Sequence, residues 1–281
     1  MLNSYKKFII VTKIVDDLIE NTVSRFGYDL YQGAGNVALS NLLFNVIPAF
    51  CGENEFEKLL ATFMSMAKGR DKTSIDAFYA QVDQLKLICD QKGHDMSQEL
   101  FLISSTKKYV DDIFKTLPGD SNNPAIPALF ALSQFWGRLY KKGFNIKHDN
   151  AKPVEEQKQI LESFSDLSQN KVKFGYGIRE FELPLKIKDI DFLDSRDDYK
   201  LQLIDVITSS FAYWAKHKMQ KESNDPFFKE LEKINFEHYI KNIVWPSAEV
   251  TPEALGADRH EFKENPADVT AKFLKRAEAN T

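Results

Sequence analysis

The sequence predicts a mostly helical α/β protein. Residues 1–142 carry apolar side chains three or four positions apart, which is the spacing of one buried helix face. Residues 143–220 follow the order strand, helix, strand, helix, which favours a small α/β unit. Residues 221–281 predict shorter helices and a proline-containing tail. We therefore expect a helical region (1–142), an α/β region of the same domain (143–220) and a C-terminal region (221–281).

The helical region is predicted from apolar periodicity and from the residues that interrupt it. The segments with helical spacing are 8–26, 36–50, 53–68, 72–89, 98–117 and 125–142. Gly27 and Gly69 are expected to end the first and third segments, and Pro48 to bend or end the second. A loop rich in Pro, Gly, Asp and Asn at 118–124 separates the last two.

The α/β region is predicted from short alternating runs. Residues 144–148 alternate apolar and polar side chains, as a half-buried strand does. Pro153 is expected to open a helix over 154–167. After Phe-Glu-Leu-Pro at 181–184, a strand follows at 185–194 with an irregularity near Asp189, and a long helix covers 199–219.

Composition predicts a folded, intracellular protein. The chain has 281 residues, 43% of them hydrophobic and 28% charged, with a net charge of −4. This charge argues against wholesale coating of nucleic acid. No continuous apolar run reaches the ~20 residues of a membrane span, and the run 8–11 is too short for a signal peptide. Cys51 and Cys89 are expected to be two buried thiols in a reducing cytoplasm.

Asp205 is the most informative single residue. It lies three positions after Gln202 on the long helix, so both side chains share a face, and its neighbours from Leu201 to Ile207 are otherwise apolar. A buried carboxylate costs several kcal/mol unless it is paired, hydrogen-bonded or bound to metal. The alternative is a surface Asp that faces solvent.

Asp149 directly follows the strand at 144–148, and ligands of α/β sheets bind at the carboxyl ends of strands. His148 beside it is a structural residue or a ligand. Several further carboxylates lie between Asp149 and Asp205. Crowded carboxylates of this kind can bind Mg²⁺. Alternatively, Asp194 is a turn residue and Asp197 or Asp198 caps the helix that follows.

Two motifs resemble the bacterial proteins of domain of unknown function family 3800. One is the stretch Asn-Pro-Ala-Ile-Pro-Ala-Leu at 123–129, followed by Trp136 and by the strand that ends in His148-Asp149-Asn150-Ala151-Lys152. The other is Phe-Leu-Asp-Ser-Arg at 192–196, followed by a helix with Gln202-x-x-Asp205. The resemblance extends in order over residues 5–250.

The resemblance implies an incomplete ribonuclease H-like sheet with a large helical insertion, in a metal-dependent nuclease that cuts phosphodiesters with Mg²⁺ or Mn²⁺. Asp149 and Asp205 would then be catalytic metal ligands within roughly 8 Å of each other, and Asp194 a further ligand or a cap. Gln202 would support Asp205 or the substrate, and Lys152 would contact a nucleic-acid phosphate.

One departure from the family pattern weakens this expectation. Family members begin with a strand that ends in Asp-Glu-Ser and supplies the first metal-binding carboxylate, and this sequence has no such motif. Asp16, Asp17 or Glu20 on the first helix would supply a metal ligand in its place, or would be part of a solvated helix face. We expect slow or absent cleavage and self-association through an exposed sheet edge. The alternative function is a non-catalytic helical interaction protein that keeps the family scaffold.

Overall fold

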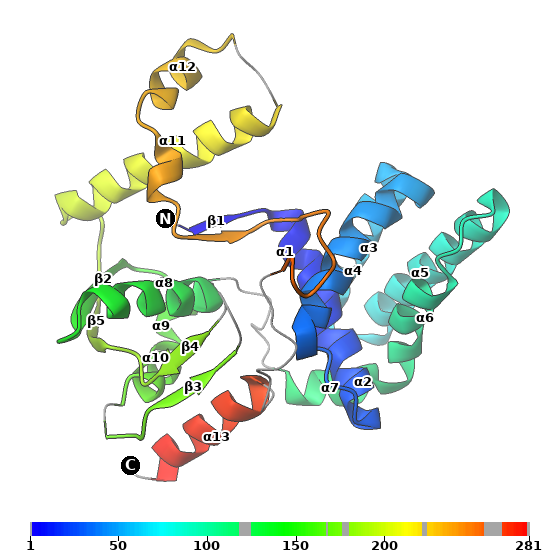
Figure 1. The fold of residues 1–281 in the computed structure, drawn as a ribbon, viewed down its shortest axis with the longest axis horizontal. Coiled ribbons are helices and arrows are strands. Elements are labelled where there is room, and N and C mark those ends of the chain that lie inside the picture. The colour runs from blue at the N-terminus through cyan, green and yellow to red at the C-terminus, as the bar shows by residue number, and fades with distance from the viewer. Residues whose placement is uncertain are drawn as a thin grey trace.

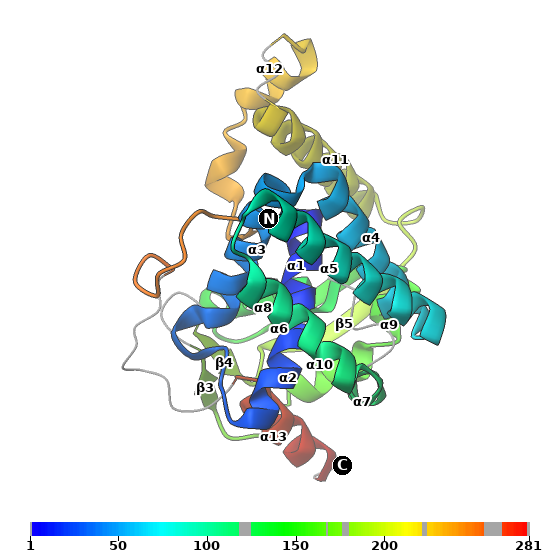
Figure 2. The same ribbon diagram turned by 90° about the vertical axis from the view of Figure 1, so that its right-hand side faces the viewer.

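The computed structural model describes residues 2–117, 125–166, 168–175, 180–220, 224–255 and 266–279. Over these residues the protein is mostly helical, with short strands in three separate two-stranded sheets. Figure 1 shows three groups of elements: the N-terminal helices, a small α/β unit, and a pair of helices that projects from both. The view in Figure 2 shows the N-terminal helices in front and the projecting pair again at one end. The loop expected at 118–124 lies outside the described residues.

The N-terminal helices confirm the predicted segments closely. They are α1 (Lys6–Lys13), the π-helix η1 (Ile14–Glu20), α2 (Asn21–Val23), η2 (Ser24–Phe26), η3 (Gln32–Ala34), α3 (Gly35–Cys51), α4 (Glu53–Gly69), α5 (Lys72–Lys92), α6 (Ser97–Ser105), η4 (Thr106–Tyr109) and α7 (Val110–Thr116). The last predicted segment forms α8 (Ala125–Leu139), which lies beside the α/β unit (Figure 1) and packs against its apolar residues through Ile126 and Leu129. Gly27 ends the first segment in the left-handed conformation, with φ +78°, as a C-terminal glycine does. Pro48 lies inside α3 without ending it.

Gly69 has a different role from the expected one. Helix α4 includes Gly69, and Arg70 takes the left-handed conformation that ends the helix. A Cβ atom at Gly69 would lie 2.5 Å from Oδ2 of Asp71. Asp71 caps the next helix, α5, by accepting a hydrogen bond from the N–H of Ser74 at 3.0 Å. A side chain at 69 would therefore have to displace the carboxylate that caps α5.

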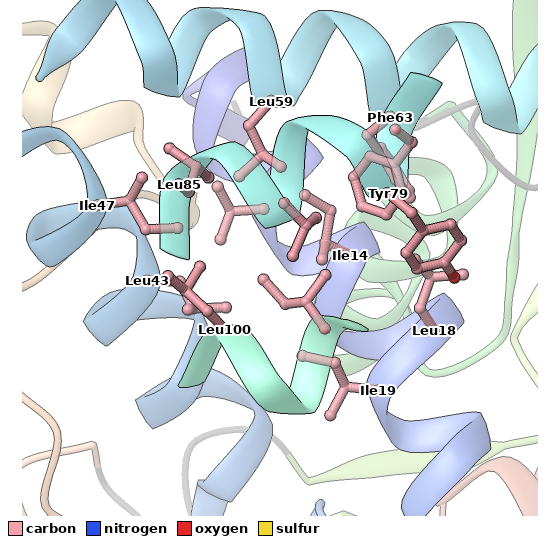
Figure 3. Close-up of a cluster of buried hydrophobic side chains, with 14 of the residues drawn as sticks. Ile14, Leu18, Ile19, Leu43, Ile47, Leu59, Phe63, Tyr79, Leu85 and Leu100 are labelled. Carbon is pink, nitrogen blue, oxygen red and sulfur yellow. The ribbon is translucent and has the colours of Figure 1, made fainter. Parts of the chain in front are cut away.

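The main core lies among these helices (Figure 3). Side chains from η1, α3, α4, α5 and α6 meet in it, including Ile14, Leu18, Ile19, Leu43, Ile47, Leu59, Phe63, Tyr79, Leu85 and Leu100. Each buried aliphatic or aromatic side chain contributes about 1.5–3 kcal/mol through removal of apolar surface from water. The hydroxyl of Tyr79 is satisfied inside this core by a 2.7 Å hydrogen bond with Thr106.

The segment Gln32–Cys51 is long and apolar enough to cross a membrane by length and composition. In this structure its α3 portion packs into the main core through Leu43 and Ile47. The amide of Asn41 donates to the carbonyl of Glu249 at 2.9 Å, and that of Asn45 to the carbonyl of Ser247 at 3.0 Å. These contacts are those of a core helix that also anchors a later part of the chain.

The α/β unit is built on a parallel pair of strands, β2 (Phe144–Asp149) and β5 (Ile187–Leu193). Phe144 pairs with Ile187 but the next residue, Asn145, pairs with Asp189, so the strand register shifts between these two pairs. The irregularity expected near Asp189 is therefore present. Helices α9 (Lys152–Glu155) and α10 (Lys158–Phe164) and the antiparallel strands β3 (Val172–Phe174) and β4 (Phe181–Leu183) lie between them. Their apolar side chains form a second core.

The C-terminal elements connect the other groups. Helix α11 (Tyr199–Gln220) packs against α12 (Pro226–Glu232) and η6 (Phe236–Tyr239) in a small aromatic core. Strand β6 (Asn242–Val244) pairs in parallel with β1 (Leu2–Ser4), so the start of the chain lies beside a segment about 240 residues later (Figure 1). Helix α13 (Pro266–Ala279) adds Val269 and Phe273 to the second core.

Several predicted elements differ from the structure. The expected helix over 154–167 is two short helices, α9 and α10, and the tail after Pro266 contains α13 because proline is favoured at a helix start. Strands β1, β3, β4 and β6 were not predicted; each has only three residues. The described strands do not join into one sheet, so the structure shows a mostly helical protein without the ribonuclease H-like sheet.

Candidate functional site

The first candidate site is the corner where β2 and β5 end. Asp149 is the last residue of β2, and its Oδ1 atom accepts hydrogen bonds from the N–H groups of Asn150 at 2.9 Å and Ser195 at 3.0 Å. Ser195 belongs to the turn that follows β5. Because the strands are parallel, both bring polar residues to the same end of the pair.

Gln202 joins this corner to α11. Its Nε2 atom donates to the carbonyl oxygens of Ser195 at 2.8 Å and Arg196 at 3.2 Å. A continuous set of hydrogen bonds therefore runs from Asp149 through Ser195 to the first turn of α11. The amide of Gln202 is used here as a structural connection between a turn and a helix.

The other acids near this corner are helix caps or ion-pair partners. The guanidinium and the N–H of Arg196 hydrogen-bond to the Asp194 carboxylate and lower its pKa to about 2. Asp198 caps α11, because its Oδ1 atom accepts from the N–H of Lys200 at 2.9 Å. The capping interpretation is thus confirmed for Asp198, and Asp194 has both oxygens occupied by Arg196.

The structure places Asp205 at the protein surface. Gln202 to Ser209 are all exposed, including the apolar neighbours of Asp205. Within the described residues its carboxylate makes no hydrogen bond or ion pair. The expectation that Asp205 is buried in an apolar turn is therefore wrong. The physical reason is that α11 packs through Leu201, Phe211 and Trp214, which leaves the intervening turns in solvent.

The predicted ligands do not form a three-residue metal centre. Among the described residues, no group of three or more His, Cys, Asp or Glu side chains is placed to hold a metal ion. Asp149 and Asp205 supply carboxylate oxygen atoms, the ligands that Mg²⁺ prefers. The third predicted ligand, Asp194, has both carboxylate oxygens hydrogen-bonded to Arg196 instead. The Lys152 side chain is 85% exposed, and its Nζ atom forms an ion pair with Oε1 of Glu156 at 3.7 Å. The Nδ1 atom of His148 hydrogen-bonds to the backbone carbonyl oxygen of Asp149 at 2.6 Å.

The acids of the first long helix have a different environment from the expected one. Asp17 and Glu20 are buried and Asp16 is half-buried, so the solvated helix face is not observed. Burial raises the pKa of Asp16 to about 6, although Asn36 donates a 3.1 Å hydrogen bond to it. Lys13 lies 3.6 Å from Asp17. These acids line the N-terminal bundle, and no metal group includes them among the described residues.

The second candidate site is an apolar groove of about 590 Å³ between α8, α11, α12 and η6. Its lining residues are Leu132, Phe135, Trp136, Val206, Ile207, Ser210, Leu231, Ile234, Phe236, Tyr239 and Lys241. This volume lies in the range of ~300–1,000 Å³ that is usual for ligand sites. Lys241 supplies the positive charge; its Nζ atom donates to the carbonyl of His238 at 2.7 Å.

The groove continues into an exposed apolar ridge on α11. Val206 is 63% exposed, Leu203 55% and Ile204 54%. Large exposed apolar side chains also lie on α8, among them Trp136 and Leu139. We call the groove and this ridge together the α11 surface. The sequence signal for it was the run of apolar residues at 203–207, because a helix cannot bury all sides of such a run against one neighbour.

Comparisons with protein-family models, curated proteins and solved structures gave no match. The geometry of the corner and of the α11 surface is therefore the basis for assigning a function.

Proposed function

We propose that this protein is a non-catalytic interaction protein that assembles with a second copy of itself through the α11 surface. The observation that carries this proposal is the exposure of Leu203, Val206 and Ile207 on consecutive turns of one helix. Contiguous exposed apolar patches on folded proteins mark interaction sites. Full burial of one such side chain contributes about 1.5–3 kcal/mol, so covering this ridge provides the main driving force for association.

A second copy is the occupant that fits the shape of this surface. A two-fold interface uses the same patch on both molecules, so the patch must be complementary to itself. The α11 surface has a ridge, at Leu203 and Val206, directly beside a groove. Two copies in antiparallel arrangement can therefore each place the ridge of α11 against the groove of the other.

The charges on this surface are also complementary. The carboxylate of Asp205 on α11 has no hydrogen-bond or ion-pair partner within the described residues. Lys241 in the groove donates to the carbonyl of His238 and lies 6.0 Å from the centre of the Phe135 ring, and no carboxylate neutralises it among the described residues. In an antiparallel pair, Asp205 of one copy would face the cationic side of the other. Exposed pairs of this kind contribute little free energy, about 0–1 kcal/mol, and chiefly select the orientation.

Sedimentation velocity tests this proposal. The wild-type protein is expected to shift from monomer to dimer between about 1 and 100 µM, which corresponds to a modest binding free energy. Ile207→Lys places a charge in the groove and should keep the protein monomeric over that range. The matched control is Leu87→Lys on α5, since Leu87 is 55% exposed but lies on another helix.

Two results would overturn self-assembly through this surface. One is a wild-type protein that stays monomeric at every concentration. The other is an equal loss of dimer in Leu87→Lys and Ile207→Lys, which would mean that the effect of added charge is not specific to α11.

Metal-dependent phosphodiester hydrolysis is a second candidate function, and the hydrogen-bonded corner favours it. Asp149, Ser195 and Gln202 connect the end of β2 to α11, and Asp205 lies one helical turn beyond Gln202. Mg²⁺ in nucleic-acid enzymes is commonly held by one or two carboxylates together with substrate phosphates. Asp149 and Asp205 would hold the ion, which would activate water and stabilise the leaving oxygen.

Calorimetric titration with Mn²⁺, in the presence of a single-stranded oligonucleotide, tests this second candidate. A site at the corner should give heat that Asp149→Asn and Asp205→Asn both remove, while Asp191→Asn on the same sheet leaves it unchanged. Identical heats for the wild type and Asp205→Asn would rule out metal binding at that residue. Within the ribonuclease H-like scheme that the sequence resemblance implies, cleavage should then depend on the same two carboxylates.

A further inference from the structure

We propose that Cys51 and Cys89 form an intramolecular disulfide bond that fastens the C-terminal end of α3 to α5. The two Sγ atoms lie 2.9 Å apart, and the residues are 5% and 2% exposed. Both thiols are free in this structure. The sequence predicted buried thiols, which is confirmed, but the spacing along the chain did not indicate that they touch.

The packing around the two sulfur atoms favours a cross-link within one molecule. Cys51 is the last residue of α3 and Cys89 lies in the last turn of α5, and both belong to the main core. The atoms need to approach from 2.9 Å to the bond length of ~2.05 Å, a movement that small side-chain rotations supply. Burial shields each thiol from the thiols of other molecules, so the neighbouring sulfur is the reaction partner.

Oxidation by a peroxide completes the bond with balanced chemistry. The thiolate of one cysteine attacks a peroxide oxygen, which breaks the O–O bond and leaves a sulfenic acid and one water after protonation. The second sulfur attacks the sulfenic sulfur, so the S–S bond forms, the S–O bond breaks and a second water leaves. The sum is two thiols and one hydrogen peroxide giving one disulfide and two waters.

The rate of this reaction should rise with pH. Burial and the contact with Cys89 raise the pKa of the Cys51 thiol to about 12, so only a small fraction is thiolate at neutral pH. The thiolate is the reactive form. Slow oxidation at pH 7 and faster oxidation at pH 9 are therefore expected for the folded protein.

Intact-mass measurement after denaturing alkylation tests the proposal. The full chain is treated with hydrogen peroxide while folded, then unfolded and alkylated with iodoacetamide. We expect two alkyl groups before oxidation and none afterwards, with a loss of about 2 Da from the unmodified monomer mass. Dithiothreitol should restore both alkylation sites.

Each single variant, Cys51→Ser and Cys89→Ser, is a control that retains one thiol and forms no intramolecular bond. The wild-type measurement stands alone if either variant folds poorly. The cross-link closes a loop of 37 residues between positions 51 and 89, so the oxidised protein should melt higher by roughly 5–10 °C. Two alkylation sites remaining after peroxide, or disulfides found exclusively in covalent dimers, would overturn the proposal.

Discussion

The side-chain amide of Gln202 lies 2.8 Å from the carbonyl oxygen of Ser195 and donates a hydrogen bond to it. Ser195 in turn donates its N–H to Asp149 at the end of β2. This relationship sets where α11 leaves the α/β unit. The turns that follow Gln202 face solvent, and α11 contacts α12 and η6 only further along, from Phe211 onward. The corner thus positions the exposed ridge on which the proposed assembly depends.

Replacing Gln202 should loosen this connection. Gln202→Ala removes both hydrogen bonds to the turn after β5, and we expect the free energy of unfolding to fall by about 0.5–1 kcal/mol, because both bonds lie at the surface. Urea denaturation at low protein concentration checks this. An unchanged midpoint would mean that the hydrogen bonds seen here contribute nothing to the fold.

Replacing Asp205 should not destabilise the monomer. Its carboxylate is exposed and unpaired within the described residues, so Asp205→Asn is expected to change the free energy of unfolding by less than about 0.5 kcal/mol. The comparison with Gln202→Ala, three residues earlier on the same helix, is made in the same denaturation series. A clear loss of melting temperature in Asp205→Asn would show that the side chain accepts a structural hydrogen bond.

Stability should depend on pH through the acids of η1. Burial raises the pKa of Asp16 from 3.8 to about 6, and Asp17 shifts in the same direction for the same reason. The folded state therefore binds more protons than the unfolded state between these values. The resulting stability is fully present below pH ~3.8 and is lost as pH rises through 6.

Asp16→Asn should remove most of this dependence, because an amide keeps the hydrogen-bond acceptor toward Asn36 without the charge. At pH 8 we expect it to raise the free energy of unfolding by about 1–3 kcal/mol. The matched control is Asp83→Asn on the exposed side of α5. Equal pH profiles for the wild type and Asp16→Asn, by thermal melting between pH 4 and 8, would contradict the assignment.

The main core should be sensitive to truncation in a way that exposed apolar residues are not. Leu59 on α4 is fully buried in the main core, and Leu59→Ala is expected to lower the free energy of unfolding by about 2–5 kcal/mol. Leu87→Ala, on the exposed side of α5, should cost less than about 0.5 kcal/mol. Similar losses for both variants in urea denaturation would show that this cluster is not the main source of stability.

The sequence predicted the helices of the N-terminal bundle because periodicity and burial coincide there. Phe78, Val82 and Leu85 repeat at helical spacing, and all three are fully buried. In η1 the predicted face is buried, at Val15 and Leu18, but the face that was expected to be solvated is buried as well, at Asp17 and Glu20. The segment is enclosed by other helices on nearly all sides, and the sequence pattern of one helix does not show how many neighbours cover it.

The candidate site was less predictable for a related reason. Asp149 was placed correctly at the end of a strand, because alternation marks where β2 stops. Asp205 was interpreted as buried because Ile204 and Val206 beside it are apolar, but sequence does not show which side of an apolar helix has a neighbour. The groove is formed by α8, α11, α12 and η6, and local patterns do not show which elements meet in space.

Hydrogen–deuterium exchange of α11 as a function of protein concentration tests self-assembly through this helix most directly. The peptide that contains residues 203–210 should exchange more slowly at about 100 µM than at about 1 µM, because a second copy covers it, while peptides from α5 exchange equally at both. Equal exchange of residues 203–210 at the two concentrations would contradict the proposed interface.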